Sequence, residues 1–228
     1  VVTHGGQVVL SLVREALPAL KPEDVLIRVE AAPINPSDIG SMLGAADLSL
    51  AWTADGAAGP ELVAPVPAAS LPAMRSSRAA FMSVGLEGAG TVVAAGSSHA
   101  AQSLMGKTVA AMAGGMYARY RCVAAAECLV LPEGTSAVEA ASCFVNPLAA
   151  LGMVETARRE GHTAIVQTAA ASNLGQILLR ICLADGVPLV NVVRSQQQEE
   201  LLRAQGARYV CNSSSGDFRD RLVDAIAA

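Results

Sequence analysis

Aromatic and charged side chains are scarce in this sequence. Aromatic residues make up 3% and charged residues 16% of its 228 residues, whereas 52% are hydrophobic. A chain of this composition can bury a sizeable core, which excludes an intrinsically disordered protein. The formal net charge of −4 is not the basic excess that nucleic-acid-binding proteins carry. We therefore expect one large or two small globular domains, and no nucleic-acid partner.

Targeting and membrane-spanning segments are not visible either. No uninterrupted run of about 18 apolar residues suggests a transmembrane helix, and the first residues lack the basic and apolar regions of a secretory signal. The five cysteines form no C-x-x-C pair, and this odd, scattered set favours free thiols in a reducing compartment. We expect a cytoplasmic protein without a membrane partner.

Residues that could ligate a metal ion are few and scattered. A tetrahedral zinc site needs three or four converging nitrogen or sulfur ligands. The three histidines stand alone, at His4, His99 and His162, and the cysteines are spread along the chain. We predict that the protein has no metal site.

Residues 163–194 predict a strand, a tight turn, a helix and a second strand. Residues 164–166 form a short apolar run, as expected of a buried parallel strand, and residues 189–193 form another. Four apolar residues after the turn recur at the spacing of one helix face: Leu174, Ile177, Leu178 and Ile181. Gly186 ends this helix, so the segment is predicted to be a βαβ unit.

The turn of this unit is built from small residues. Against the dinucleotide-binding pattern G-x-G-x-x-G, Gly175 matches, whereas Ala170 and Ser172 stand at the other two glycine positions. Small residues let the backbone approach a pyrophosphate, whose charge a helix N-terminus favours. A plain α/β turn that binds nothing would carry the same residues. The candidate cofactor-binding residues of the turn are Thr168, Ala171, Ser172, Asn173, Leu174 and Gly175.

Short strands with glycines between them are predicted before this unit, over residues 25–32, 85–96, 106–112 and 118–124, and they suggest a small barrel-like β domain. Tyr117 and Tyr120 fall next to or within the last of them, where packing is favoured over catalysis. Ser37 or Asp38 would cap a short helix ending at Leu43. Residues 45–83, rich in alanine, proline and serine, predict a long irregular lid or surface loop.

Further helices are predicted on either side of the βαβ unit. Ser136 and Glu139 have the spacing of a capping box, and Pro147 suits the first position of the next helix. After the unit, Ser195 and Gln198 predict the start of another helix, residues 208–211 a third strand, and residues 217–228 a final helix.

Several short motifs, taken in this order and spacing, resemble the medium-chain dehydrogenase/reductase superfamily, and most closely its zinc-free quinone oxidoreductase and 2-enoyl thioester reductase branches. The motifs are Ala32-Pro-Ile-Asn-Pro-Ser-Asp38, Gly85-x-Glu87-Gly88-x-Gly90, Val145-Asn-Pro147, Thr168 to Gly175 and Asn191-Val-Val-Arg194. The resemblance implies an α/β protein with a GroES-like β-barrel catalytic domain, residues 1–135, followed by a Rossmann NADP-binding domain, residues 136–228. It also implies NADPH bound between the domains, and a homodimer of the full-length protein.

The sequence departs from this family in three ways. Zinc-dependent members carry a histidine where Leu86 stands, and a cysteine in the region of Asn35. The 2-enoyl thioester reductases place a proton-donating tyrosine after the N-P-S-D stretch, but no tyrosine occurs between Asp38 and Met116. The doubly wound Rossmann sheet also stops after its third strand and the helix that follows, so we expect a truncated chain.

Candidate functional residues outside the turn each have a second interpretation. The resemblance places Asn35 and Asp38 beside the nicotinamide and substrate as catalytic residues, but both residue types also bond to local backbone in turns. Asn146 either contacts the cofactor or caps a helix. Arg194 ends the second strand, where an arginine suits the 2′-phosphate of NADP and Ser195 could add a donor; otherwise Arg194 is a solvated surface charge.

These observations lead to one principal hypothesis and two alternatives. The principal hypothesis is a zinc-independent, NADPH-dependent reductase of quinones or activated C=C bonds, acting on a small-molecule substrate. The first alternative is a 2-enoyl thioester reductase, acting on enoyl groups carried by CoA or acyl carrier protein. The second is a catalytically silent protein that binds NADPH.

Overall fold

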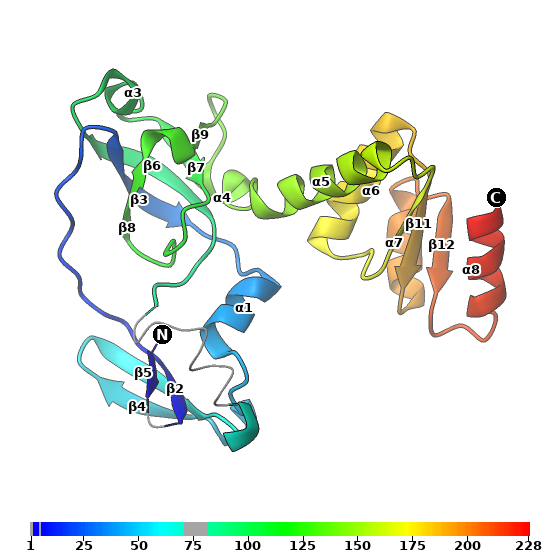
Figure 1. The fold of residues 1–228 in the computed structure, drawn as a ribbon, viewed down its shortest axis with the longest axis horizontal. Coiled ribbons are helices and arrows are strands. Elements are labelled where there is room, and N and C mark those ends of the chain that lie inside the picture. Colours follow the sequence, from blue (N-terminus) through cyan, green and yellow to red (C-terminus); the bar gives the residue numbers. More distant parts are fainter. Residues whose placement is uncertain (1, 5, 71–81) are drawn as a thin grey trace. The chain divides into compact units, whose positions relative to one another are not determined.

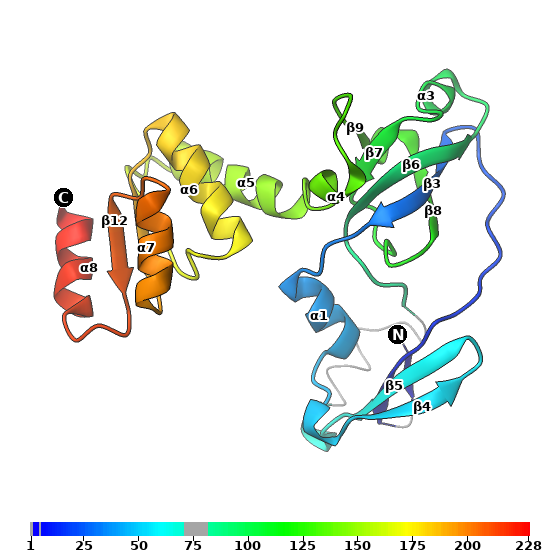
Figure 2. The same ribbon diagram turned by 180° about the vertical axis from the view of Figure 1, so that it is seen from behind.

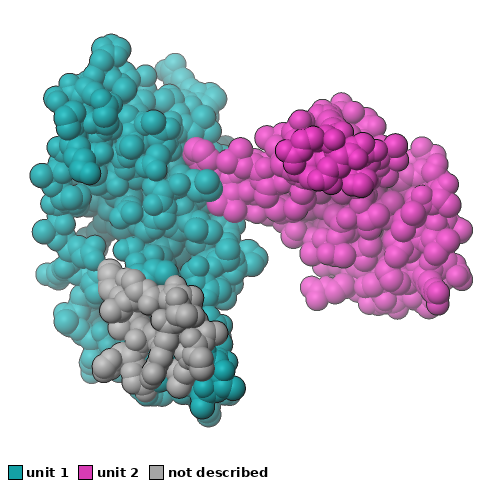
Figure 3. Space-filling model, in the orientation of Figure 1, with its two compact units in different colours: residues 1–143 teal, residues 144–228 magenta. Residues whose placement is uncertain are grey.

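A computed structural model describes residues 2–4, 6–70 and 82–228 of the chain (Figure 1). The chain divides into two compact units, Val1–Cys143 and Phe144–Ala228, which Figure 3 colours separately. Each unit has a hydrophobic core of its own. The boundary expected after residue 135 lies inside the first unit.

The larger sheet of the first unit is antiparallel, with the strand order β8-β3-β6-β7-β9. Its strands are β3 (Asp24–Ala31), β6 (Gly88–Ala95), β7 (Thr108–Ala111), β8 (Tyr120–Ala124) and β9 (Cys128–Val130). Their inward residues, among them Ile27, Val92 and Val109, form the core. The four strands predicted from the sequence are thereby confirmed, and β9 is an addition to them.

A second sheet of the first unit has the strand order β1-β2-β5-β4. It contains β1 (Val2–His4), β2 (Gln7–Leu10), β4 (Trp52–Gly56) and β5 (Gly59–Pro65), and β4 and β5 run side by side as a hairpin (Figure 2). The prediction of an irregular loop over residues 45–83 is therefore wrong where these strands lie. Pro60 and Pro65 sit near the two ends of β5, where a missing N–H disturbs the pairing little. Residues 71–81 of the expected loop lie outside the described residues.

The first unit also contains short helical segments. They are α1 (Pro36–Leu43), η1 (Leu48–Leu50), η2 (Ala68–Ser70), α3 (His99–Gln102), η3 (Ala125–Glu127) and α4 (Ala137–Ala140). The capping box before α4 is confirmed, since the Glu139 N–H donates to Ser136 Oγ at 3.3 Å and the Ser136 N–H donates to the Glu139 carboxylate at 2.9 Å.

The second unit is a parallel α/β unit with the strand order β10-β11-β12. Its strands are β10 (Ile165–Gln167), β11 (Leu189–Val193) and β12 (Tyr209–Asn212), and its helices are α5 (Val145–Arg159), α6 (Asn173–Asp185), α7 (Gln196–Ala204) and α8 (Phe218–Ala227). Leu178, Leu202 and Val210 contribute to one core between helices and sheet. All of these elements agree with the prediction to within a few residues. Pro147 is the third residue of α5, however, and not the first.

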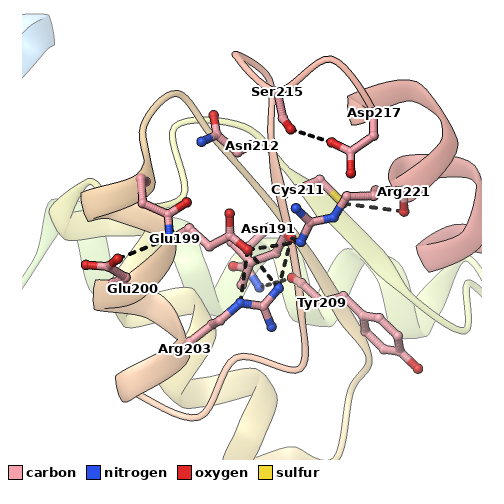
Figure 4. A network of polar contacts seen from close by, with 12 residues as sticks. Asn191, Glu199, Glu200, Arg203, Tyr209, Cys211, Asn212, Ser215, Asp217 and Arg221 are labelled. Carbon is pink, nitrogen blue, oxygen red and sulfur yellow. Dashed lines mark hydrogen bonds and ion pairs between the residues drawn. The ribbon is translucent and has the colours of Figure 1, made fainter.

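A buried carboxylate joins three elements of the second unit (Figure 4). Glu199 of α7 accepts hydrogen bonds from Arg203 Nε at 3.0 Å, from Arg203 Nη2 at 2.9 Å and from Arg221 Nη2 of α8 at 2.9 Å. Both arginines also donate to the carbonyl oxygen of Val210 in β12. Although burial opposes ionisation, the hydrogen bonds from Arg221 and Arg203 hold the pKa of Glu199 below its usual value. This network fixes α7 and α8 against β12.

One stretch, Ala137–Arg159, is long and apolar enough to cross a membrane, judged by length and composition alone. Residues 141–144 separate its two helices, α4 and α5. A single stretch of this kind is weak evidence, because the core helix of a protein that never enters a membrane passes the same test. The absence of a membrane partner stays a prediction.

Candidate cofactor pocket and catalytic segment

The turn between β10 and α6 is held against the neighbouring strand. The N–H of the buried Ala170 donates to the carbonyl oxygen of Val192 in β11 at 3.2 Å. Ala169 adopts a left-handed backbone with φ of 51°, which turns the chain sharply. Ser172 then caps α6, its Oγ accepting from the Gly175 N–H at 3.1 Å. The helix therefore begins at Asn173, two residues before the glycine expected to open it.

Gly175 is required by close packing and not by its backbone angle. A Cβ at this position would lie 2.7 Å from the carbonyl carbon and 2.8 Å from the Cα of Ala170, and closer still to the Ala170 oxygen. No side chain can therefore stand here without moving the turn away from the helix. Close contact between the turn and the first helix is the role of the last glycine in dinucleotide-binding turns.

A pocket of about 240 Å³ opens beside this turn, and it is lined by Ala169, Ala171, Ser172, Val193, Arg194 and Gln198. Three of these, Ala171, Ser172 and Arg194, are candidate cofactor residues from the sequence. Of the other candidates, Gly175 is buried behind the turn, Leu174 is half-buried, and Thr168 and Asn173 are exposed beside it. The pocket thus brings together residues of two consecutive β–α connections.

Arg194 has a fixed backbone and an uncommitted side chain. Its N–H donates to Gln198 Oε1 at 2.9 Å, and its carbonyl oxygen accepts from Ser214 Oγ at 2.8 Å. Within the described part of the chain, its exposed guanidinium forms no hydrogen bond or ion pair. Ser195 instead caps α7, with its Oγ accepting from the Gln198 N–H at 3.3 Å, and it is not among the described residues that line the pocket.

The electrostatics of this pocket favour an anion. Arg194 carries a full positive charge, the pocket lies at the N-termini of α6 and α7, and none of the described residues that line it is acidic. Gln198 was not singled out as a site residue, although its spacing from Ser195 already placed it in the first turn of a helix. Ala169 and Val193 also line the pocket, but their apolar side chains give no indication of this in the sequence.

The side chains of Gln167 and Asn191 form a buried hydrogen-bond network next to the β10–α6 turn. Gln167 Nε2 donates to Asn191 Oδ1 at 2.7 Å and to the carbonyl oxygen of Gly175 at 3.1 Å. Asn191 Nδ2 donates in turn to the carbonyl oxygens of Leu189 and Tyr209, at 3.3 and 3.1 Å. The buried amides of Gln167 and Asn191 therefore link all three strands to the first turn of α6.

In the first unit, Asn35, Asp38 and Glu87 are brought together as a buried polar group, with exposed fractions of 5%, 1% and 1%. Asn35 Nδ2 donates to Glu87 Oε1 at 3.0 Å. The Asp38 carboxylate accepts from the Asn35 N–H and from the Leu86 N–H, both at 2.9 Å. Asn35 is the N-cap of α1, so the prediction that Ser37 or Asp38 caps this helix is wrong. Pro36 begins the helix because it has no N–H to leave unsatisfied there.

Tyr117 lies against the same segment, and its hydroxyl donates to the carbonyl oxygen of Pro33 at 2.8 Å. Burial, followed by the nearby carboxylate of Asp38, raises the pKa of Tyr117 to about 12. Tyr120 is 43% exposed, so the prediction that both tyrosines pack in a core is wrong for Tyr120.

Asn146 is the second residue of α5, whose N-cap is Phe144, so the interpretation of Asn146 as a helix cap is wrong. Across the described residues, no group of three histidine, cysteine, aspartate or glutamate side chains is arranged to hold a metal ion. The absence of a metal site stays a prediction.

Comparison with known proteins decides the family. Residues 21–133 match the alcohol dehydrogenase GroES-like domain. Mouse mitochondrial enoyl-[acyl-carrier-protein] reductase is 31% identical over 214 residues, which cover 91% of this chain and 50% of the mouse protein. The chain belongs to the medium-chain dehydrogenase/reductase superfamily. It spans about half the length of the curated relatives it matches.

Solved structures of this superfamily have the same fold. A Mesorhizobium loti protein described as a candidate NADPH:quinone reductase is 31% identical, with a TM-score of 0.68 over 92% of this chain and 54% of that one. Escherichia coli quinone oxidoreductase, solved with NADPH, is 21% identical, with a TM-score of 0.66 over 93% of this chain and 58% of that one. The predicted fold class, an α/β chain with a GroES-like domain, is confirmed.

Proposed function

We propose that this protein is an NADPH-dependent, zinc-independent reductase of quinones or activated C=C bonds. The observation that carries the proposal is the anion-favouring pocket at the β10–α6 turn, with the uncommitted guanidinium of Arg194 at its edge. Relatives in the superfamily include a candidate NADPH:quinone reductase and enoyl reductases, which agrees with this chemistry.

The residues of the second unit fit the cofactor. Ser172, the N-cap of α6, lines the pocket, so the first turn of this helix would meet a pyrophosphate bound there. Ser172, Ala171 and Ala169 would line its path, and Arg194 would meet the 2′-phosphate that distinguishes NADPH from NADH. When bound, NADPH supplies the hydride.

In the first unit, we assign Asn35 to contact with the nicotinamide or substrate. We assign Asp38 to the orientation of Asn35. Each carboxylate oxygen of Asp38 accepts a backbone N–H, so Asp38 holds the segment together. Asn35 is oriented from the side by Glu87, through the amide hydrogen bond of 3.0 Å. Such fixed polar groups orient a reactant without reorganisation at the moment of reaction.

A 2-enoyl thioester reductase is the second candidate. The 31% identity to the mouse enoyl-[acyl-carrier-protein] reductase favours it. The missing tyrosine argues against it, since no tyrosine occurs between Asp38 and Met116 to donate the proton as in those reductases. The third candidate, a silent NADPH-binding protein, requires only the pocket of the second unit.

Steady-state oxidation of NADPH by the whole protein that contains these 228 residues separates the three candidates. The acceptors should be a panel of quinones and enones and a series of enoyl thioesters of increasing chain length. Turnover with quinones or enones, and little with thioesters, supports the principal proposal. A preference of about 100-fold or more for thioesters, equivalent to about 2.7 kcal/mol, supports the second candidate. Tight NADPH binding without turnover of any acceptor supports the third.

A further inference from the structure

Two segments of the first unit, distant from each other in the sequence, meet at Tyr117. The N–H groups of Met116 and Tyr117 donate to the carbonyl oxygens of Gly85 and Val84, each at 3.0 Å, and the Tyr117 hydroxyl donates to Pro33 O. The ring lies directly over the backbone of Gly85, where an added Cβ would come within 2.5 Å of Tyr117 Cδ1. Gly85 also has a left-handed φ of +94°, which an L side chain rarely adopts. The backbone is therefore shaped to admit the tyrosine ring.

We propose that Tyr117 is a positioning residue, which holds the Asn35–Asp38 segment in its productive place for the reduction. This inference rests on the proposed function. Pro33, which accepts the hydroxyl hydrogen bond, lies two residues before Asn35. Asp38 joins the other end of the same segment to Leu86. The segment is thus tied at both ends to residues 84–86, once through Tyr117 and once through Asp38.

The geometry separates this role from proton donation. The Tyr117 hydroxyl already donates a hydrogen bond to a backbone carbonyl oxygen. Its ionised form would also stand near the carboxylate of Asp38, and burial and that carboxylate raise the pKa of Tyr117 to about 12. A hydroxyl with such a high pKa is a poor proton donor near neutral pH. What Tyr117 provides is a rigid link between two segments that are distant in sequence.

The replacement Tyr117→Phe tests this role because it removes the hydroxyl and keeps the ring over Gly85. The matched control is Tyr120→Phe, which removes the same atom from an exposed tyrosine of the adjacent strand. Within the described part of the chain, the Tyr120 hydroxyl forms no hydrogen bond. Both variants should be made in the whole protein, and kcat, KM, the NADPH dissociation constant and amide hydrogen exchange should be measured.

We expect Tyr117→Phe to lower kcat by about two- to tenfold, the range that corresponds to one lost hydrogen bond. The NADPH dissociation constant should change less than kcat, because the pocket assigned to the pyrophosphate and the 2′-phosphate belongs to the second unit. The N–H groups of Asn35 and Leu86, both bonded to Asp38, should exchange faster with solvent. Tyr120→Phe should change none of these quantities.

Three results would overturn the inference. A loss of kcat of about 1,000-fold or more, with unchanged amide exchange, would make Tyr117 a proton donor. Unchanged kcat and exchange in Tyr117→Phe, or equal losses in Tyr120→Phe, would remove its positioning role. If the unmodified protein reduces no acceptor, the proposed function fails, and amide exchange alone then decides whether Tyr117 holds the segment.

Discussion

The replacement Gly175→Ala tests the close contact on which the cofactor pocket depends. The added Cβ would meet three backbone atoms of Ala170, at 2.7 and 2.8 Å for the two carbons and closer for the oxygen. Backbone cannot rotate away as the end of a side chain can, so the turn and α6 must separate. Overpacking of this kind costs about 1–3 kcal/mol, and we expect the upper half of that range.

Gly152→Ala is the matched control. Gly152 lies in α5, and nothing stands within 4 Å of the place its Cβ would take. An alanine in an open helix interior stabilises by about 1 kcal/mol relative to glycine. The two variants should therefore differ in unfolding free energy by about 3–4 kcal/mol, with Gly175→Ala the less stable.

Urea unfolding of both variants, followed by NADPH titration, measures the effect. Gly175→Ala should also weaken NADPH binding, because the displaced turn no longer presents the first N–H groups of α6 to the pyrophosphate. Gly152→Ala should bind NADPH as the unmodified protein does. Equal stabilities of the two variants, or a destabilised Gly175→Ala that binds NADPH normally, would show that the pocket does not depend on this close contact.

Three further predictions follow from the described residues. Glu199→Gln should destabilise the second unit by about 1–3 kcal/mol near neutral pH. Folding lowers the pKa of Glu199 from its usual 4.5, so the stabilisation by the ionised carboxylate is present above pH 4.5 and is lost as the pH falls below it. Urea unfolding of the two proteins should therefore show a difference in stability that shrinks in acid. Elemental analysis after dialysis should find no stoichiometric zinc, because Leu86 and Asn35 replace ligand types, and about one zinc per chain would contradict this. Among the described strands β10 pairs only with β11, so the 228-residue chain expressed alone should self-associate through the open edge, and a monodisperse monomer in sedimentation would disprove it.

Local patterns predicted much of the second unit. Each signal that succeeded there involves residues only a few positions apart in the sequence. These signals are the apolar spacing of α6, the glycine after α6 and the capping residues before α7, and each corresponds to an element of the structure. The start of α6 was misplaced because Gly175 was taken as its first residue, whereas Ser172 Oγ caps it and makes Asn173 the first.

Contacts between distant residues could not be predicted in the same way. The β4–β5 hairpin was missed because its prolines suggested a loop, and only the pairing with β2 and β4 shows that they lie near strand ends. Tyr117 meets Pro33 across 84 positions, and no periodicity indicates this. The resemblance to a family placed Asn35 and Asp38 beside the nicotinamide and substrate, but the hydrogen bond from Asn35 to Glu87 emerged only from the structure.

Arg194 is proposed to make the pocket selective for NADPH, and titration of NADPH and NADH by cofactor fluorescence measures that selectivity. A charge-assisted hydrogen bond at this partly exposed site should make NADPH bind at least about tenfold more tightly than NADH. Arg194→Ala should remove most of that preference and leave NADH binding nearly unchanged, whereas Arg180→Ala, which replaces an exposed arginine of α6, should preserve it. Equal affinities of the unmodified protein for the two cofactors, or equal losses for both in Arg194→Ala, would contradict the account.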